Sequence, residues 1–188
     1  MKFTVLVGSQ MGSKTKIAMT KTLDLLTDKY PEIDTTLLDL ADYKLPFSDG
    51  RNYLDYDGDA KYVTTTIMES DAIIIGTPIY QASIPAPLKN IFDMLPVHAL
   101  EGKVASIVVT AGSARHYLIA EQQLKPILSY MKAQLVPNYV FVEEMDFKFK
   151  EIENDDVVFR LERLIEDTVL LAEVYKQMVD ARNAEYDF

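Results

Sequence analysis

The chain of 188 residues has a formal net charge of −10 and no cysteine, and 48% of its residues are hydrophobic. This balance is typical of a globular protein, and the length fits a single domain, taken here as residues 1–188. The missing cysteines exclude disulfides, thiolate metal sites and cysteine nucleophiles, so redox chemistry would need a bound organic cofactor. Because an acidic surface repels phosphate backbones and anionic lipids, we expect neither nucleic acid nor a membrane as partner.

The first half of the chain alternates short apolar runs with helical patterns. The apolar runs predict strands at Phe3–Val7, Ile33–Leu38 and Ala72–Ile75. The first run is too short for a signal-peptide core or a membrane span, so we expect a cytoplasmic protein. Apolar residues at helical spacing predict helices over Ser13–Tyr30, 60–69 and Pro85–Leu95.

Residues 42–59 predict a long, mobile loop that contains Pro46, two glycines and many acidic residues. Its Asp55–Asp59 run resembles a calcium loop only superficially, because Gly58 comes too early for an EF-hand and no helix pair flanks it. We therefore interpret this run as a solvated acidic segment and expect no metal site.

The second half continues the alternation. Strands are predicted at Val104–Val109 and Leu135–Val142, and Pro137 favours an edge position or strand start for the latter. Helices are predicted over Ser113–Lys132 and Asp155–Arg182. The last helix has an apolar stripe at Val157, Leu161, Leu164, Thr168, Leu171, Tyr175 and Met178, and its length suggests a role in oligomer contacts. Five strands, each followed by a helix, predict an α/β fold with a doubly wound parallel sheet.

Ligands of such sheets bind beyond the carboxyl ends of the strands, which selects three loops. The first, Gly8–Lys16, turns on two glycines and opens a helix with hydroxyl groups and Lys14. Free N–H groups at a helix start suit a phosphate, and we favour that interpretation over an ordinary N-cap at Ser13. The loop lacks the Walker A and GxGxxG patterns.

The other two loops suit a flat ligand without identifying it. Three prolines stiffen Gly76–Pro87, and Tyr80 is available to lie against a ring or simply to cover the end of the sheet. The Thr110–His116 loop has small residues, and Gly112 permits close backbone approach. Arg115 or His116 could meet a second anion, but we interpret His116 and His98 as structural rather than catalytic.

With these loops in place, the sequence resembles the NADPH-dependent FMN reductase family. Within it, the chain is most similar to flavin reductases that serve alkanesulfonate-type two-component monooxygenases. The resemblance runs from Phe3 to about Val142 and is densest in Gly76–Tyr80, Leu88–Pro96, Ala99–Val104 and Leu124–Leu128. It implies a flavodoxin-like five-stranded sheet, homodimers or homotetramers, and FMN reduced by NADPH or NADH.

The resemblance also implies the binding residues. The FMN phosphate would lie on Ser9, Ser13, Lys14 and Thr15. The isoalloxazine would rest against Thr77, Pro78, Ile79, Tyr80 and Gln81, and against Thr110, Ala111, Gly112 and Ser113. Nicotinamide would stack on the open flavin face. Hydride transfer then needs orientation rather than an acid or base, so no catalytic side chain is expected.

The sequence departs from the family pattern at two places, and each departure leads to a hypothesis. Gln10 and Met11 stand where an arginine usually follows Gly-Ser, which leaves the choice between NADPH and NADH open. Gln122 stands where the two-component branch tends to have an inserted aromatic residue. Because Pro126 has no N–H for the carbonyl of Gln122, we expect a kink or π-bulge near Gln122, close to a subunit interface or the flavin edge.

Other functions remain open at this point. Reduced FMN could pass to a partner monooxygenase or to a small acceptor such as a quinone, an azo compound or oxygen. The main rival is a flavodoxin-like FMN electron carrier without a substrate of its own, which the acidic surface would suit. A flavin-free α/β binding module is the third possibility.

Overall fold

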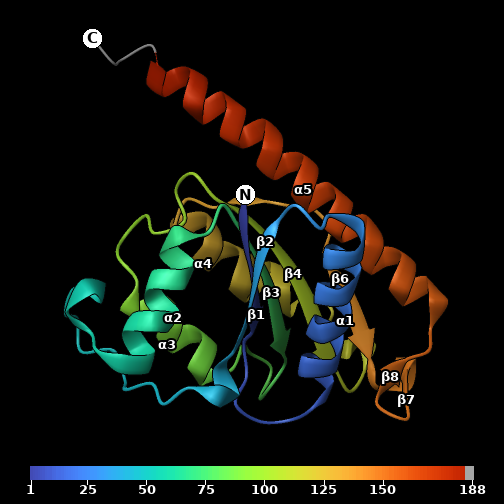
Figure 1. Ribbon diagram of the computed structural model, residues 1–188. Helices are drawn as coiled ribbons and strands as arrows, with labels where there is room; N and C mark the ends of the chain where they lie inside the picture. The colour runs from blue at the N-terminus through green and yellow to red at the C-terminus, as the bar shows by residue number, and fades with distance from the viewer. Residues whose placement is uncertain (185–188) are drawn as a thin grey trace.

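The computed structural model describes residues 1–184, which form an α/β fold around a parallel sheet (Figure 1). Its strands lie in the order β2-β1-β3-β4-β5, and β6 pairs with β4 beyond β5. This order is the flavodoxin-like one, so the predicted fold class is confirmed. The strands are β1 (Lys2–Val7), β2 (Asp34–Asp39), β3 (Ala72–Pro78), β4 (Val104–Ala111), β5 (Gln134–Leu135) and β6 (Val140–Glu143).

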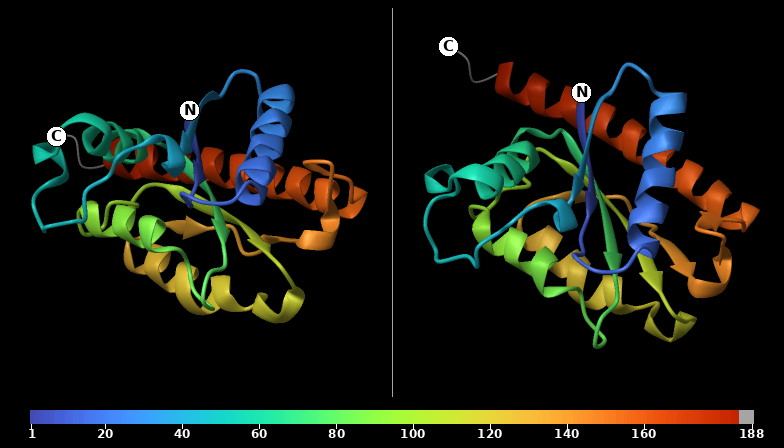
Figure 2. Two further views of the ribbon diagram at one scale, coloured as in Figure 1. Left: turned by 90° about the horizontal axis from the view of Figure 1, so that it is seen from below. Right: turned by 60° about the horizontal axis from the view of Figure 1, so that its bottom comes forward.

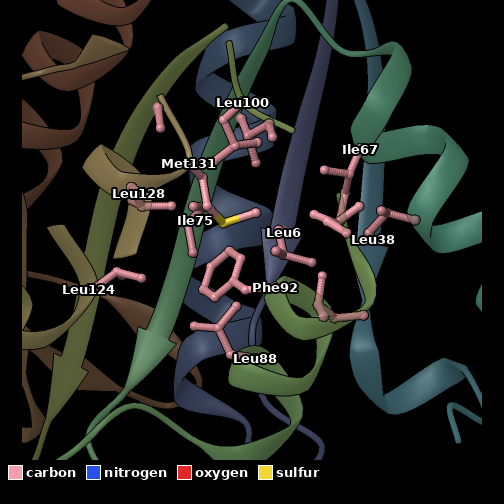
Figure 3. Packing of buried hydrophobic residues seen from close by; sticks show 14 of the residues in the cluster. Leu6, Leu38, Ile67, Ile75, Leu88, Phe92, Leu100, Leu124, Leu128 and Met131 are labelled. Atoms are coloured by element: carbon pink, nitrogen blue, oxygen red, sulfur yellow. The ribbon is translucent and has the colours of Figure 1, made fainter. Parts of the chain in front are cut away.

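Helices cover both faces of the sheet, as its apolar strands require (Figure 2). The α-helices are α1 (Lys14–Lys29), α2 (Gly58–Glu69), α3 (Ala86–Met94), α4 (Lys125–Tyr130) and α5 (Asp155–Ala184). Val5 and Val7 face the core under α1 and α5, whereas Leu6 faces the core under α2, α3 and α4. In that second core, Leu6 and Ile75 pack with Phe92 and Leu88 of α3 (Figure 3).

The fifth strand position is filled by two short strands, so the prediction of one strand over Leu135–Val142 was wrong. The ladder with β4 ends after Leu135 and resumes at Val140. Pro137 lies in the gap, where it has no N–H to donate to β4, and Lys125 Nζ bonds its carbonyl oxygen at 2.6 Å. The edge position that Pro137 favoured is confirmed, but the interruption of the strand was not predicted.

The predicted helix over Ser113–Lys132 is also interrupted. A 3₁₀ turn spans Ala114–His116, a π-helix spans Ala120–Leu124, and only then does α4 begin. The N–H of Lys125 donates to the carbonyl of Ala120, five residues earlier, which is the π-type bond. The expected π-bulge before Pro126 is thus confirmed.

A β-hairpin between β6 and α5 had no counterpart in the sequence analysis. It pairs β7 (Phe147–Lys148) with β8 (Glu151–Ile152). Its central residues, Phe149 and Lys150, have φ angles of 49° and 69°. Asn and Gly are the residues that usually adopt positive φ in such turns. Strands of two residues are too short to show a period, and the turn lacks its usual residues, so no sequence signal was present.

The loop over residues 42–59 is attached to α3. Asn90 donates from Nδ2 to the carbonyl of Pro46 at 2.9 Å and accepts from the N–H of Ser48 at 2.9 Å. Tyr56 is buried, and Tyr53–Asp55 form a 3₁₀ turn. Asn90 therefore anchors this loop.

Helix α5 packs on the sheet through its first part and then runs past the sheet edge (Figure 1). The predicted stripe is buried from Val157 to Thr168, but Met178 is 63% exposed. An ion pair connects the projecting part of α5 to the residue before β3, because Lys176 Nζ lies 2.8 Å from Oδ1 of Asp71. Neither α5 nor any other helix within residues 1–184 is long and apolar enough to cross a membrane.

Asp71 supports a test of this ion pair through pH. Burial raises the pKa of Asp71, but hydrogen bonds from Lys176 and the Lys2 backbone outweigh it, so the pKa lies below its ordinary value. The unfolded chain then binds the proton more tightly, so the contribution to stability is complete above about pH 4 and is lost as pH falls through the folded pKa.

We therefore expect Asp71→Asn to lower the free energy of unfolding at pH 7 by about 1 kcal/mol, a modest value because solvent screens this half-exposed pair. The difference from the unmodified protein should shrink as the pH drops below about 4. Urea unfolding across this pH range measures both effects. Exposed Asp28 gives a control, since Asp28→Asn should change stability little. A loss that does not depend on pH would contradict the explanation.

Candidate functional site

The three loops selected from the sequence meet at the carboxyl edge of the sheet, which is the lower edge in Figure 1. They enclose a cavity of about 310 Å³. Nine predicted site residues line it, and Gly12 joins them; the nine are Ser13, Lys14, Thr15, Pro78, Ile79, Tyr80, Thr110, Ala111 and Gly112. The lining does not include Ser9, Thr77, Gln81 or Ser113, nor Arg115 or His116.

The first loop places the start of α1 at the cavity. The first backbone bond into the helix runs from the N–H of Ile17 to the carbonyl of Ser13, at 2.9 Å. The N–H groups of Lys14, Thr15 and Lys16 precede this bond and lack helical acceptors. The Ser13 side chain does not cap the helix, so its hydroxyl is free for another acceptor. The site thus offers a row of donors at the positive end of a helix dipole.

Ser9 and Thr15 show how hydroxyl groups are arranged behind these donors. Ser9 is 2% exposed, and its Oγ has no hydrogen-bond partner within residues 1–184. A buried hydroxyl without a partner is costly unless a ligand satisfies it. Thr15 Oγ1 lies 2.7 Å from Thr110 Oγ1, which links the first loop to the third.

The second loop is fixed to both neighbours. Ile79 donates its N–H to the carbonyl of Thr110 at 3.2 Å, and Tyr80 donates its hydroxyl to the carbonyl of Met11 at 2.7 Å. Gly12 has φ +86°, and a Cβ there would lie 3.2 Å from the Tyr80 hydroxyl. Tyr80 therefore forms a wall of the cavity, whereas Thr77 is fully buried with its hydroxyl bonded to the Pro78 carbonyl.

Two glycines allow β1 and β3 to approach at the base of the site. Gly8 donates its N–H to the carbonyl of Gly76 at 2.8 Å. A Cβ on Gly8 would lie 2.7 Å from that same carbonyl oxygen, and a Cβ on Gly76 would lie 2.3 Å from Cγ of Met19. Neither position can hold a side chain without displacing its surroundings.

The lysines of the first loop are engaged by carboxylates. Lys14 Nζ lies 2.5 Å from Oε1 of Glu144, and Lys16 Nζ lies 2.7 Å from Oδ2 of buried Asp39. The hydrogen bond with Asp39 holds the pKa of Lys16 above its ordinary value. Glu144 follows β6, so sequence analysis, which assigned Lys14 to a phosphate, did not consider this competitor.

The irregular turn before α4 also reaches the site, but through Gln123 rather than Gln122. Gln122 is exposed, and its side chain makes no hydrogen bond within residues 1–184. Gln123 donates from Nε2 to the carbonyl of Ala82 at 3.0 Å and accepts from the hydroxyl of Ser83. The π-helix thus contacts the second loop through Gln123, whereas the hypothesis that Gln122 lies near a subunit interface or the flavin edge stays a prediction.

Comparison with known proteins identifies the family to which this site belongs. The model of the NADPH-dependent FMN reductase family matches residues 1–147. The chain belongs to this family. A relative from Geobacillus thermodenitrificans (strain NG80-2), named NAD(P)H-dependent FAD/FMN reductase, is 38% identical over 170 residues, or 90% of this chain and 92% of the relative. The NADH-dependent FMN reductase SfnF of Pseudomonas fluorescens (strain Pf0-1) is 27% identical over 154 residues, 82% of each protein.

A solved structure extends the likeness to three dimensions. The apo form of an NADH:FMN oxidoreductase (EMOB) matches with a TM-score of 0.77 and 25% identity, over 90% of this chain and 88% of that one. As a family member, the chain is an NAD(P)H:FMN oxidoreductase that uses FMN and a nicotinamide cosubstrate. These findings favour the reductase over the flavodoxin-like carrier.

Substitutions of two glycines at the site distinguish an effect on ligand binding from an effect on folding. A Cβ on Gly112 would find its nearest contact, Oε2 of Glu144, only at 4.0 Å, so Gly112→Ala should fold normally. We expect it to shift Tm by less than about 2 °C and to raise the FMN Kd about fivefold, because the methyl group enters the cavity. Gly8→Ala is the contrast, with a loss of about 2 kcal/mol in stability. Unchanged FMN affinity in Gly112→Ala would contradict a flavin beside Gly112.

Proposed function

We propose that the cavity between the three loops binds FMN and holds it for hydride transfer from NADH or NADPH. The observation that carries this proposal is the row of free N–H groups at the start of α1, where Ser13, Lys14 and Thr15 line a cavity also walled by Pro78–Tyr80. Ser9, Ser13, Lys14 and Thr15 would hold the phosphate, with the unpartnered hydroxyl of Ser9 as one donor. Such a donor set suits a phosphate monoester.

The shape of the cavity supports a flavin that stays accessible. A volume of about 310 Å³ is at the lower end of the range for ligand sites, about 300–1,000 Å³. A ring whose edges rest against Ile79 and Tyr80 and against Thr110–Ser113 would keep one face open. The nicotinamide ring would stack on that face, so that the protein contributes orientation.

When bound, FMN supplies the hydride acceptor, and the protein must place donors beside the reduced ring. Ile79 and Tyr80 cannot do this with their N–H groups, which donate to the carbonyls of Thr110 and Ser83. The N–H groups of Gln81, Gly112 and Ser113 have no acceptor within residues 1–184. Of these, Gly112 lines the cavity, so its N–H would be the donor that stabilises negative charge on the reduced flavin.

Steady-state kinetics test the proposal. NADH or NADPH oxidation is followed at varied FMN, after the FMN Kd has been measured by fluorescence quenching. We expect saturable oxidation that requires FMN, with a KM for FMN close to its Kd if flavin binds and leaves in each cycle. Absence of both FMN binding and nucleotide oxidation would overturn the proposed function. The ratio of the two kcat/KM values decides the nucleotide preference.

Glu144 gives a prediction about affinity. Because Glu144 competes with a phosphate for Lys14, we expect Glu144→Gln to lower the FMN Kd about two- to fivefold, a modest gain since the pair is solvent-exposed. Lys14→Gln should weaken binding and abolish the benefit of Glu144→Gln. An equal gain with and without Lys14 would show general charge repulsion instead of competition for Lys14. Isothermal titration of the four proteins completes this cycle.

The acceptor and the assembly extend the proposal. We expect reduced FMN to pass to a partner monooxygenase, and transfer to a quinone, an azo compound or oxygen is the alternative. The projecting part of α5 exposes Leu170, Val174 and Met178, which supports its use in a homodimer or homotetramer. The fold of residues 1–184 supports one flavodoxin-like domain, and a cytoplasmic location remains a prediction.

A further inference from the structure

The wall of the cavity ends in a strained two-residue turn. Tyr80 and Ser83 exchange both backbone hydrogen bonds, each at 3.0 Å, and form an isolated antiparallel bridge. The two residues between them, Gln81 and Ala82, have φ angles of 48° and 58°. Positive φ at both central positions is the pattern of a type I′ turn, which strongly favours Asn and Gly.

Neither Gln nor Ala adopts positive φ without strain. A Cβ at positive φ meets the following carbonyl oxygen, so residues of this kind persist there only when their surroundings hold them. Both Gln81 and Ala82 are exposed, so packing of their own side chains does not hold the turn. The restraint must come from groups that contact the turn from outside.

Gln123 supplies that restraint with both ends of its amide. Nε2 donates to the carbonyl of Ala82 at 3.0 Å, and Oε1 accepts from the hydroxyl of Ser83. The side chain is half-buried, so these bonds are partly shielded from water. One carboxamide thus bridges the turn and the start of the next segment, which resists unwinding of the turn.

The π-helix explains why Gln123 faces the turn. Its wide turn over Ala120–Leu124 contains one residue more than an α-helical turn, and this changes the direction in which the side chains of the turn, that of Gln123 included, point relative to α4. Pro126, in the first turn of α4, has no N–H to continue a regular ladder. The irregular turn therefore has a local function, which is to aim a carboxamide at the second loop.

The effect of the turn continues into the cavity through Tyr80. Its backbone closes the turn, while its hydroxyl bonds the carbonyl of Met11 in the first loop. We propose that Gln123 is a positioning residue for the flavin site: it holds the Gln81–Ala82 turn in its strained conformation and thereby positions Tyr80, which lines the cavity, against the flavin. The inference rests on the proposed FMN site and assigns no direct flavin contact to Gln123.

A double-mutant cycle with a relieved turn tests the proposal. Gln123→Ala should raise the FMN Kd about tenfold, the loss expected when two hydrogen bonds no longer order the wall. Gln122→Ala is the matched control, since it removes the same side chain one position earlier, and its Kd should stay within about twofold. In an Ala82→Gly background, where glycine adopts positive φ without strain, Gln123→Ala should cost less than about threefold.

Amide hydrogen exchange of the flavin-free protein gives a second measurement. The N–H of Ser83 donates to Tyr80 across the turn, so its exchange should accelerate about tenfold in Gln123→Ala and not in Gln122→Ala. Circular dichroism melting checks that each variant folds. If the unmodified protein fails to bind FMN, the proposed function fails, while Ser83 exchange still decides whether Gln123 holds the turn.

Two results would overturn the inference. The first is an equal effect of Gln123→Ala and Gln122→Ala on FMN affinity or on Ser83 exchange, because Gln123 would then have no special hold on the turn. The second is a Gln123→Ala effect of the same size with Ala82 and with glycine at that position. That outcome would mean that Gln123 acts on flavin binding by a route other than the strain at residues 81–82.

Discussion

The site depends on one backbone contact, the hydrogen bond of 2.8 Å from the N–H of Gly8 to the carbonyl of Gly76. It joins the ends of two neighbouring strands, β1 and β3, at the edge where both chains leave the sheet. No side chain fits at either glycine, so the loops leave the sheet nearly in contact. Beyond this contact, Tyr80 of the second loop donates its hydroxyl to the carbonyl of Met11 in the first. The cavity is what remains between them.

Electrostatics place a second constraint on the site. A chain with net charge −10 must bind an anionic cofactor against its own field. For the proposed phosphate site the structure offers uncharged donors, the free N–H groups at the start of α1, whose partial charge acts only at short range. The two nearby lysines are already paired with Glu144 and Asp39. A phosphate at this helix start would be bound by the backbone donors in competition with these carboxylates.

The sequence predicted much of the fold because its strands are buried on both faces and therefore stand out as apolar runs. It also predicted most of the cavity lining, since parallel strands deliver the residues that follow them to one edge of the sheet. Pro126 indicated the π-helix, because proline has no backbone N–H whatever its surroundings, so the helical hydrogen bond that it would make is missing. Pro137 indicated the edge position of the last strand, but the break around it was not predicted, because it depended on where pairing with β4 could resume.

The amino-acid sequence alone thus determined which strands are buried, which loops meet, and where the backbone lacks a donor, because these follow from side-chain type and neighbouring covalent structure. Tertiary structure alone decided that Glu144 holds Lys14 and that Gln123 braces residues 82 and 83. It also decided that Phe149 and Lys150 adopt positive φ. Such features are hydrogen bonds and ion pairs between distant segments, or local conformations held against their own preference. Their geometry exists only once the chain has packed.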